Sequence, residues 1–171
     1  MSDIKQLISI VIPVFNESES IGFLLDEVIN VMKSNKFNFE LIVVTDGSKD
    51  NTQNVLKQLI LQIKELSVIS LRKNYGQTAA MAAGFDNSKG DIVITLDGDL
   101  QNDPNDFPKL ISEINNGYDL ICGWRFDRKD KLINRKIPSK IANKLIAHVT
   151  GLKLHDYGCS LKAFKLSLIH I

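Results

Sequence analysis

The chain has 171 residues, of which 44% are apolar, and this composition suits one compact domain with its own hydrophobic core. Its 21 lysines and arginines nearly balance its 20 aspartates and glutamates, so no overall charge draws it toward nucleic acid or another polyanion. Its longest apolar run, "LISIVIPVF", is far shorter than the ~20 residues of a membrane-spanning helix, and without a signal-peptide pattern or CxxC spacing we expect a reducing, cytosolic setting.

Short runs rich in β-branched residues alternate along the chain with stretches of helical period. Strands are predicted at 7–13, 39–45, 66–71, 91–97 and 118–123. Helices are predicted at 21–32, 52–64 and 104–115. Asn16, followed by Glu19 three residues later, indicates a capping box for the first helix. This order predicts an α/β fold, with a mostly parallel sheet flanked by helices, in a single domain.

Polar clusters follow the predicted strands at their carboxyl ends. They read "FNES", "DGSKDNT", "RKNYGQ" and "DGDLQNDP" in chain order. Each cluster taken singly has an ordinary explanation as turn or helix-cap chemistry. Ligands of open parallel sheets bind beyond the carboxyl ends of the strands, so the shared position of all four favours a binding site there.

Two aspartates in the last cluster indicate a metal site. Asp97 and Asp99 are two residues apart in a segment expected to be extended, so their side chains should point to the same side, and Gly98 lets a ligand approach the backbone. Paired carboxylates suit Mg²⁺ or Mn²⁺ bridged to a diphosphate. A calcium loop is excluded, because Asn102 and Pro108 stand where glycine and glutamate are required. GxGxxG and GxxxxGK[ST] motifs are absent.

Six motifs in this order resemble the inverting family-two glycosyltransferases, in the branch of dolichyl-phosphate mannose synthase and the undecaprenyl-phosphate glycosyltransferases. They are "VIPVFNE", "DGSKDNT", "KNYGQ", "DGDLQNDP", "GWRFDRKD" and "DYGCSLKAF". The resemblance implies a GT-A, Rossmann-like fold and a metal-dependent hexosyltransferase of envelope biogenesis. It also implies a UDP- or GDP-linked sugar donor, Mg²⁺ or Mn²⁺, and a polyprenyl phosphate acceptor.

The resemblance also assigns roles to individual residues. It implies a nucleotide pocket lined by Pro13, Phe15 and Glu17, with Asp46 near the base and ribose. Asp97 and Asp99 match the DxD metal motif, and Gln101 is expected to complete the metal and diphosphate site. The residues expected to be catalytic are Asp99, Arg125 and Asp156. For Asp156 the alternatives of a base, an orienting group and a structural hydrogen bond stay open.

The chain departs from the family pattern in two places. Thr45 stands where the family usually has a second acidic residue before Gly-Ser, and a hydroxyl carries no charge. The sequence also stops soon after "CSLKAF", where the family continues. We therefore expect a nucleotide-sugar half at about 1–101 and a shortened acceptor half at about 102–171.

Arginines after the last predicted strand suit a phosphate acceptor. Arg125, Arg128 and Arg135 lie within a basic stretch, and the planar guanidinium group matches phosphate oxygens. A phosphate monoester has a second pKa of about 6, so it is already an anionic nucleophile and needs no general base. Transfer to polyprenyl phosphate is the leading hypothesis. The alternatives are transfer to a saccharide hydroxyl in envelope polysaccharide synthesis and a truncated nucleotide-sugar-binding remnant without turnover.

Residues 131–151 have the pattern of a basic amphipathic segment. Apolar residues recur at every fourth position from Ile133 to Val149, while Lys136, Lys140 and Lys144 occupy neighbouring faces. Such a segment suits an anionic membrane surface, although a helix packed on the sheet with its lysines in water explains the pattern as well. We expect a peripheral protein on the cytoplasmic face of the membrane.

Overall fold

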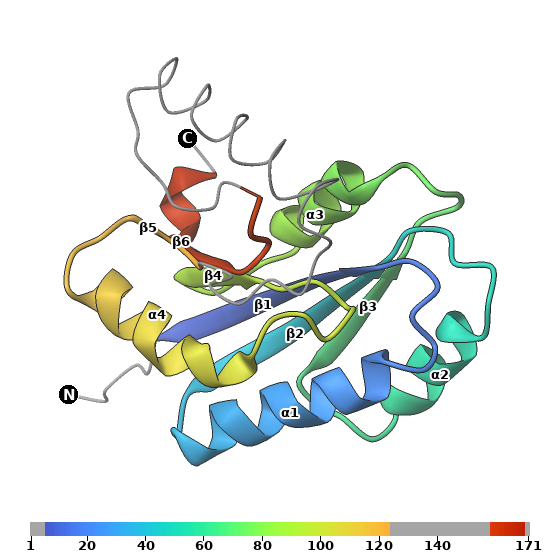
Figure 1. Ribbon diagram of the computed structural model, residues 1–171, viewed down its shortest axis with the longest axis horizontal. Coiled ribbons are helices and arrows are strands. Elements are labelled where there is room, and N and C mark those ends of the chain that lie inside the picture. The colour runs from blue at the N-terminus through green and yellow to red at the C-terminus, as the bar shows by residue number, and fades with distance from the viewer. Residues whose placement is uncertain (1–5, 124–157, 170–171) are drawn as a thin grey trace, which may run out of the picture. The chain divides into compact units, whose positions relative to one another are not determined.

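The computed structural model describes residues 6–123 and 158–169, which contain one six-stranded sheet with helices on both faces (Figure 1). The chain divides into two compact units, one made of residues 1–121 and 161–171 and the other of residues 122–160. Nearly all of the described residues belong to the first unit.

The sheet has the strand order β3-β2-β1-β4-β6-β5. Its strands are β1 (Leu7–Val14), β2 (Asn38–Thr45), β3 (Leu66–Ser70), β4 (Ile92–Thr95), β5 (Leu120–Cys122) and β6 (Lys162–Lys165). β2 and β4 pair with β1 in parallel, and β3 pairs in parallel with β2. β6 runs antiparallel to β4, with Phe164 opposite Val93. The prediction of a mostly parallel sheet flanked by helices is confirmed.

The helices cover both faces of the sheet and bring the polar loops to one edge. One face carries α1 (Ile21–Ser34), α2 (Thr52–Leu59) and α4 (Phe107–Asn115), while α3 (Gln77–Asp86) lies on the other (Figure 1). β1 and β2 are therefore buried on both sides, which explains the uninterrupted apolar runs at 10–14 and 41–44. Among the described helices, none combines the length and apolar character needed to cross a bilayer.

Several boundaries differ from the prediction. The capping box is wrong, because Asn16 lies in the loop before α1 with φ +58°, and the residue that precedes the helix is Ser20. The Asn16 side chain instead accepts a hydrogen bond from the backbone amide of Lys49. α2 ends at Leu59 rather than at 64, and β4 ends at Thr95. Asp97 and Asp99 therefore lie beyond the end of the strand, and Asp99 is part of a turn.

α3 and β6 were not predicted, for different physical reasons. α3 has the sequence "QTAAMAAGFD", whose small residues form a helix readily but show no apolar stripe. It packs closely on the sheet, since a Cβ added at Gly84 would lie 2.3 Å from Cγ1 of Val11. β6 has only four residues, with lysines at both ends, so its strand signal is short.

The close approach of α3 to β1 predicts a stability effect at Gly84. Gly84→Ala should lower the free energy of unfolding by about 1–3 kcal/mol, because the added methyl overpacks against Val11. Gly22→Ala in α1 is the matched control, since nothing lies within 4 Å of the added methyl. That change should be neutral or stabilise by about 0.5–1 kcal/mol. Urea denaturation measures both, and equal effects at the two glycines would contradict the packing argument.

Candidate functional site

A cavity of about 260 Å³ lies at the carboxyl edge of the sheet, beside the first turn of α3. Six of its lining residues are those predicted for the nucleotide and metal site: Pro13, Phe15, Glu17, Asp46, Asp97 and Asp99. They come from the ends of β1, β2 and β4, which are separate in sequence and adjacent in the sheet. The structure therefore brings the predicted residues together where ligands of parallel sheets bind.

The remaining predicted residues are one that the structure describes and four that lie outside the described residues. Gln101 is exposed and is not among the lining residues, although its backbone amide donates to Oδ1 of Asp99 at 3.1 Å. Arg125, Arg128, Arg135 and Asp156 lie outside the described residues, as does the basic segment 131–151. Their roles stay predictions.

Asp46 holds the loop before α3 in place. Its side chain is almost fully buried, at 4% exposure, and its two carboxylate oxygens accept backbone amide protons from Tyr75 at 2.7 Å and Gly76 at 2.8 Å. Gly47 beside it has φ +65°, and an added Cβ would lie 2.4 Å from the carbonyl carbon of Lys73. The loop after β2 and the loop after β3 thus meet backbone against backbone.

Asp97 and Asp99 are each held through one carboxylate oxygen. Gln77 Nε2 donates to Oδ1 of Asp97 at 2.7 Å, and the backbone amide of Gln101 donates to Oδ1 of Asp99. Within the described part of the chain, no hydrogen bond reaches Oδ2 of either aspartate. Gly98 between them is buried, and a Cβ there would lie 2.8 Å from Cγ1 of Val14. This glycine is therefore required by packing against β1, which the sequence alone did not indicate.

The chemistry of the lining fits a hard divalent cation. Glu17, Asp46, Asp97 and Asp99 are all carboxylates, whereas the described lining residues include no lysine, arginine or histidine. Mg²⁺ in phosphate-binding sites takes one or two carboxylates, and substrate phosphates and water complete its shell. The described residues contain no group of three or more acidic, histidine or cysteine side chains placed to hold a metal alone. Asp97 and Asp99 therefore suit a cation that is shared with an anionic ligand.

Sequence reasoning missed the contribution of α3 to the cavity. Asn74, Gly76, Gln77 and Ala80 also line it. The "RKNYGQ" cluster was recognised as polar and as following a strand, but its contact with Asp97 through Gln77 could not be predicted without the helix. Gly76 has φ +93°, and no atom lies within 4 Å of an added Cβ. A glycine is therefore favoured here by the backbone turn into α3 and not by close packing.

The loops after β1 and β2 brace each other through side chains that accept backbone amide protons. The donor–acceptor pairs are Asn16 N to Ser48 Oγ, Glu17 N to Thr52 Oγ1, Ser18 N to Asp50 Oδ2 and Lys49 N to Asn16 Oδ1. The donor–acceptor distances are between 2.8 and 3.1 Å. Because neighbouring loops satisfy each other's amides, this wall of the cavity is formed without a ligand.

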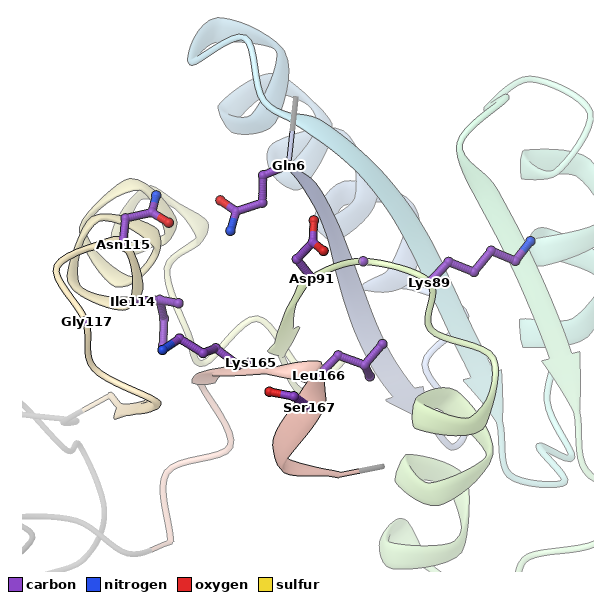
Figure 2. Close-up of a pocket in the computed structure, with 10 residues that line it drawn as sticks. Gln6, Lys89, Asp91, Ile114, Asn115, Gly117, Lys165, Leu166 and Ser167 are labelled. Carbon is purple, nitrogen blue, oxygen red and sulfur yellow. The ribbon is translucent and has the colours of Figure 1, made fainter. Parts of the chain in front are cut away.

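A second cavity, of about 620 Å³, lies at the opposite edge of the sheet near the start of β1 and β4 (Figure 2). Its lining includes Gln6, Asp91, Asn115 and Lys165. Figure 2 shows the Lys89 side chain extending away from the other labelled side chains. The Lys165 ammonium is paired with Asp119 at 2.7 Å. This cavity is larger than the first. None of the six predicted site residues that line the first cavity lines this one.

Comparisons with known proteins agree with the fold and the motifs. A family model described as Glycosyl transferase family 2 matches residues 9–170. The chain is 49% identical over 164 residues to dodecaprenyl-phosphate galacturonate synthase of Rhizobium johnstonii, which covers 95% of this chain and 48% of that protein. It is 41% identical over 172 residues to undecaprenyl-phosphate 4-deoxy-4-formamido-L-arabinose transferase of Edwardsiella ictaluri, covering 99% of this chain and 53% of that protein. The chain thus spans about half the length of these relatives.

A solved structure shares the fold. Glucosyl-3-phosphoglycerate synthase from Mycobacterium tuberculosis, crystallised with Mn²⁺, UDP and glucosyl-3-phosphoglycerate, superposes with a TM-score of 0.74 at 22% identity. The match covers 95% of this chain and 58% of that one. The predicted GT-A type of fold is confirmed.

The bracing of the loops predicts an acid-dependent effect at Asp50, whose pKa is lowered from 3.8 to about 2. Partial desolvation raises this pKa, but the hydrogen bonds that Thr52 and Ser18 donate to the ionised carboxylate lower it by more. Because the folded-state pKa lies below the unfolded value, the stabilisation is fully present above pH 3.8 and is lost as the pH falls through about 2.

Asp50→Asn should therefore reduce the acid dependence of unfolding in this pH range. Because the carboxylate is exposed, we expect a small effect on the free energy of unfolding. The matched control is Asp26→Asn, which removes an exposed carboxylate of α1 that is remote from the loops. An NMR titration of the Asp50 carboxyl carbon checks the pKa directly. A midpoint at or above 3.8 would refute the bracing role.

Proposed function

The chain belongs to glycosyl transferase family 2, and on that premise we propose that it transfers a sugar from a nucleoside-diphosphate sugar to a polyprenyl phosphate, with inversion at the anomeric carbon. The observation that carries the proposal is the pair Asp97 and Asp99 in an acidic cavity at the carboxyl edge of the sheet. The names of the two relatives refer to dodecaprenyl phosphate and undecaprenyl phosphate. Their similarity to this chain supports the same class of acceptor.

In this proposal the donor occupies the cavity, within the nucleotide-sugar half at about 1–101. Asp97 and Asp99 would hold Mg²⁺ or Mn²⁺, and Gln101, whose backbone amide donates to Asp99, would complete this site. When bound, the cation neutralises the charge that develops on the leaving diphosphate. Pro13, Phe15 and Glu17 contact the nucleotide at the end of β1.

The acceptor reacts without a general base. A phosphate oxygen of the polyprenyl phosphate attacks the anomeric carbon and forms the new C–O bond while the bond to the diphosphate breaks, and the nucleoside diphosphate leaves. Arg125, Arg128 and Arg135, in the acceptor half at about 102–171, position the acceptor phosphate by bidentate hydrogen bonds. Asp156 serves as an orienting group, as a base or through a structural hydrogen bond.

The acceptor chain stays in the bilayer, so the protein works at the cytoplasmic face of the membrane. The basic residues of 131–151 suit an anionic lipid surface. Each lysine or arginine near such a surface contributes roughly 1 kcal/mol before screening. Several together hold a domain there reversibly.

A transfer assay tests the proposed function and its metal site. The protein is incubated with Mn²⁺, labelled UDP- or GDP-sugars and either undecaprenyl phosphate or a saccharide acceptor, and lipid-extractable label supports the proposal. Asp99→Asn should abolish most of the transfer and most Mn²⁺-dependent donor binding while the fold stays intact, because an exposed charged ligand is lost. Asp103→Asn in the same loop is the control. Label that appears only on saccharide acceptors, or donor binding without any transfer, would reject the polyprenyl-phosphate proposal.

The membrane association has its own test. The protein should sediment with vesicles that contain anionic lipid, and ~0.5 M salt should release much of it, since the Debye length shortens to a few ångströms. Changing Lys136, Lys140 and Lys144 together to Glu should weaken sedimentation. The matched control changes Lys33, Lys36 and Lys57, which lie outside the segment, to Glu. Equal recovery with neutral and anionic vesicles would argue against an electrostatic surface interaction.

A further inference from the structure

The first turn of α3 connects the two ends of the cavity. Asp46, at the end of β2, accepts the backbone amide protons of Tyr75 and Gly76. The next residue, Gln77, begins α3 and donates from Nε2 to Oδ1 of Asp97 at 2.7 Å, after β4. The segment from Tyr75 to Gln77 is therefore hydrogen-bonded at both of its ends to predicted site residues, Asp46 and Asp97.

We propose that Gln77 is a positioning residue, which fixes the Asp97 carboxylate for the cation of the donor diphosphate. This inference rests on the function proposed above, and it concerns a residue to which the motifs assigned no role. Gln77 does not itself contact the cation. It acts through Asp97.

The geometry explains how a glutamine does this. An N–H donor 2.7 Å from a carboxylate oxygen makes a charge-assisted hydrogen bond, which restricts rotation of the carboxylate. With Oδ1 held by Gln77, Oδ2 is the oxygen left for a ligand. Partners that orient a metal ligand in this way typically change metal affinity 10- to 100-fold when they are removed.

The donor atom is itself held on a rigid support. α3 packs tightly against β1, since a Cβ added at Gly84 would lie 2.3 Å from Cγ1 of Val11. Asp46 anchors the amino end of the same helix through two hydrogen bonds. Gly76, with φ +93°, provides the backbone turn from which Gln77 enters the helix. Gln77 therefore presents its amide from a support that does not depend on the ligand.

A neutral donor is the appropriate choice for this position. Lysine or arginine would also hydrogen-bond to Asp97, but its positive charge would repel the cation that the carboxylate binds. A glutamate would add a negative charge next to Asp97 and could not donate when ionised. An amide orients the carboxylate and leaves its charge available to the cation.

The test uses Gln77→Met, which keeps the length and helix propensity of the side chain and removes the donor. The control is Gln58→Ala, at an exposed glutamine of α2. The Kd for Mn²⁺ is measured by electron paramagnetic resonance at a fixed concentration of UDP or GDP, whichever the wild-type protein binds. The Kd for the same nucleotide without metal is measured by calorimetry. We expect Gln77→Met to weaken Mn²⁺ binding about tenfold or more and to leave metal-free nucleotide binding nearly unchanged, with no effect in the control.

A double-mutant cycle separates positioning from a general structural effect. If Gln77 acts through Asp97, then Gln77→Met should weaken Mn²⁺ binding no further in the Asp97→Asn background. Additive losses, or equal losses of metal-free and metal-dependent binding, would overturn the inference. Wild-type Mn²⁺ affinity in Gln77→Met together with weak binding in Asp97→Asn would overturn it while leaving the proposed metal site standing. Unchanged binding in Asp97→Asn would reject that metal site as well.

Discussion

The carboxylate of Asp46 accepts the backbone amide protons of Tyr75 and Gly76, and the geometry of the carboxyl edge depends on this contact. Asp46 is almost fully buried, and a buried carboxylate is tolerated only when hydrogen bonds replace the water that it loses. The two amides supply them, and in return the loop after β3 is held at the point where α3 begins. Without this contact the first turn of α3, which lines the cavity, would have no anchor at the end of β2.

Hydrogen bonds from backbone amides to side chains also stabilise the rest of the carboxyl edge, where side chains of one loop accept amide protons of the neighbouring loop. Asn16, Ser48, Asp50 and Thr52 all accept backbone amide protons across the gap between the loops after β1 and β2. These amides are therefore satisfied within the protein. A cavity built in this way is largely formed before a ligand arrives, so less binding free energy is spent on ordering loops.

The sequence predicted what depends on local pattern and missed what depends on contacts between distant segments. β1 and β2 were predicted because both of their faces are buried, and α1 because its apolar residues repeat at helical spacing. α3 was missed because its alanines carry no pattern, and its position depends on Val11 meeting Gly84. Asn16 looked like a helix cap because Glu19 follows it, but Lys49 is the partner that decides its conformation. The motif residues were found, whereas Gln77 could not be linked to Asp97 without the fold.

Thr45 departs from the family pattern, and the structure explains why an uncharged residue fits at this position. Its side chain is fully buried and donates a hydrogen bond to Ser48 Oγ at 3.0 Å, and it does not line the cavity. An uncharged residue suits this buried position, because a carboxylate there would need further donors. The lining keeps its acidic character without it, through Glu17, Asp46, Asp97 and Asp99.

That acidic character constrains the chemistry of any anionic ligand. A diphosphate placed beside four carboxylates, with no cationic side chain among the described lining residues, would be repelled unless a cation lay between them. The same charge distribution makes the neutral amide of Gln77 a better partner for Asp97 than a cationic side chain would be. Under the proposed function, the cation, the two aspartates after β4 and the glutamine that begins α3 therefore meet the same electrostatic requirement.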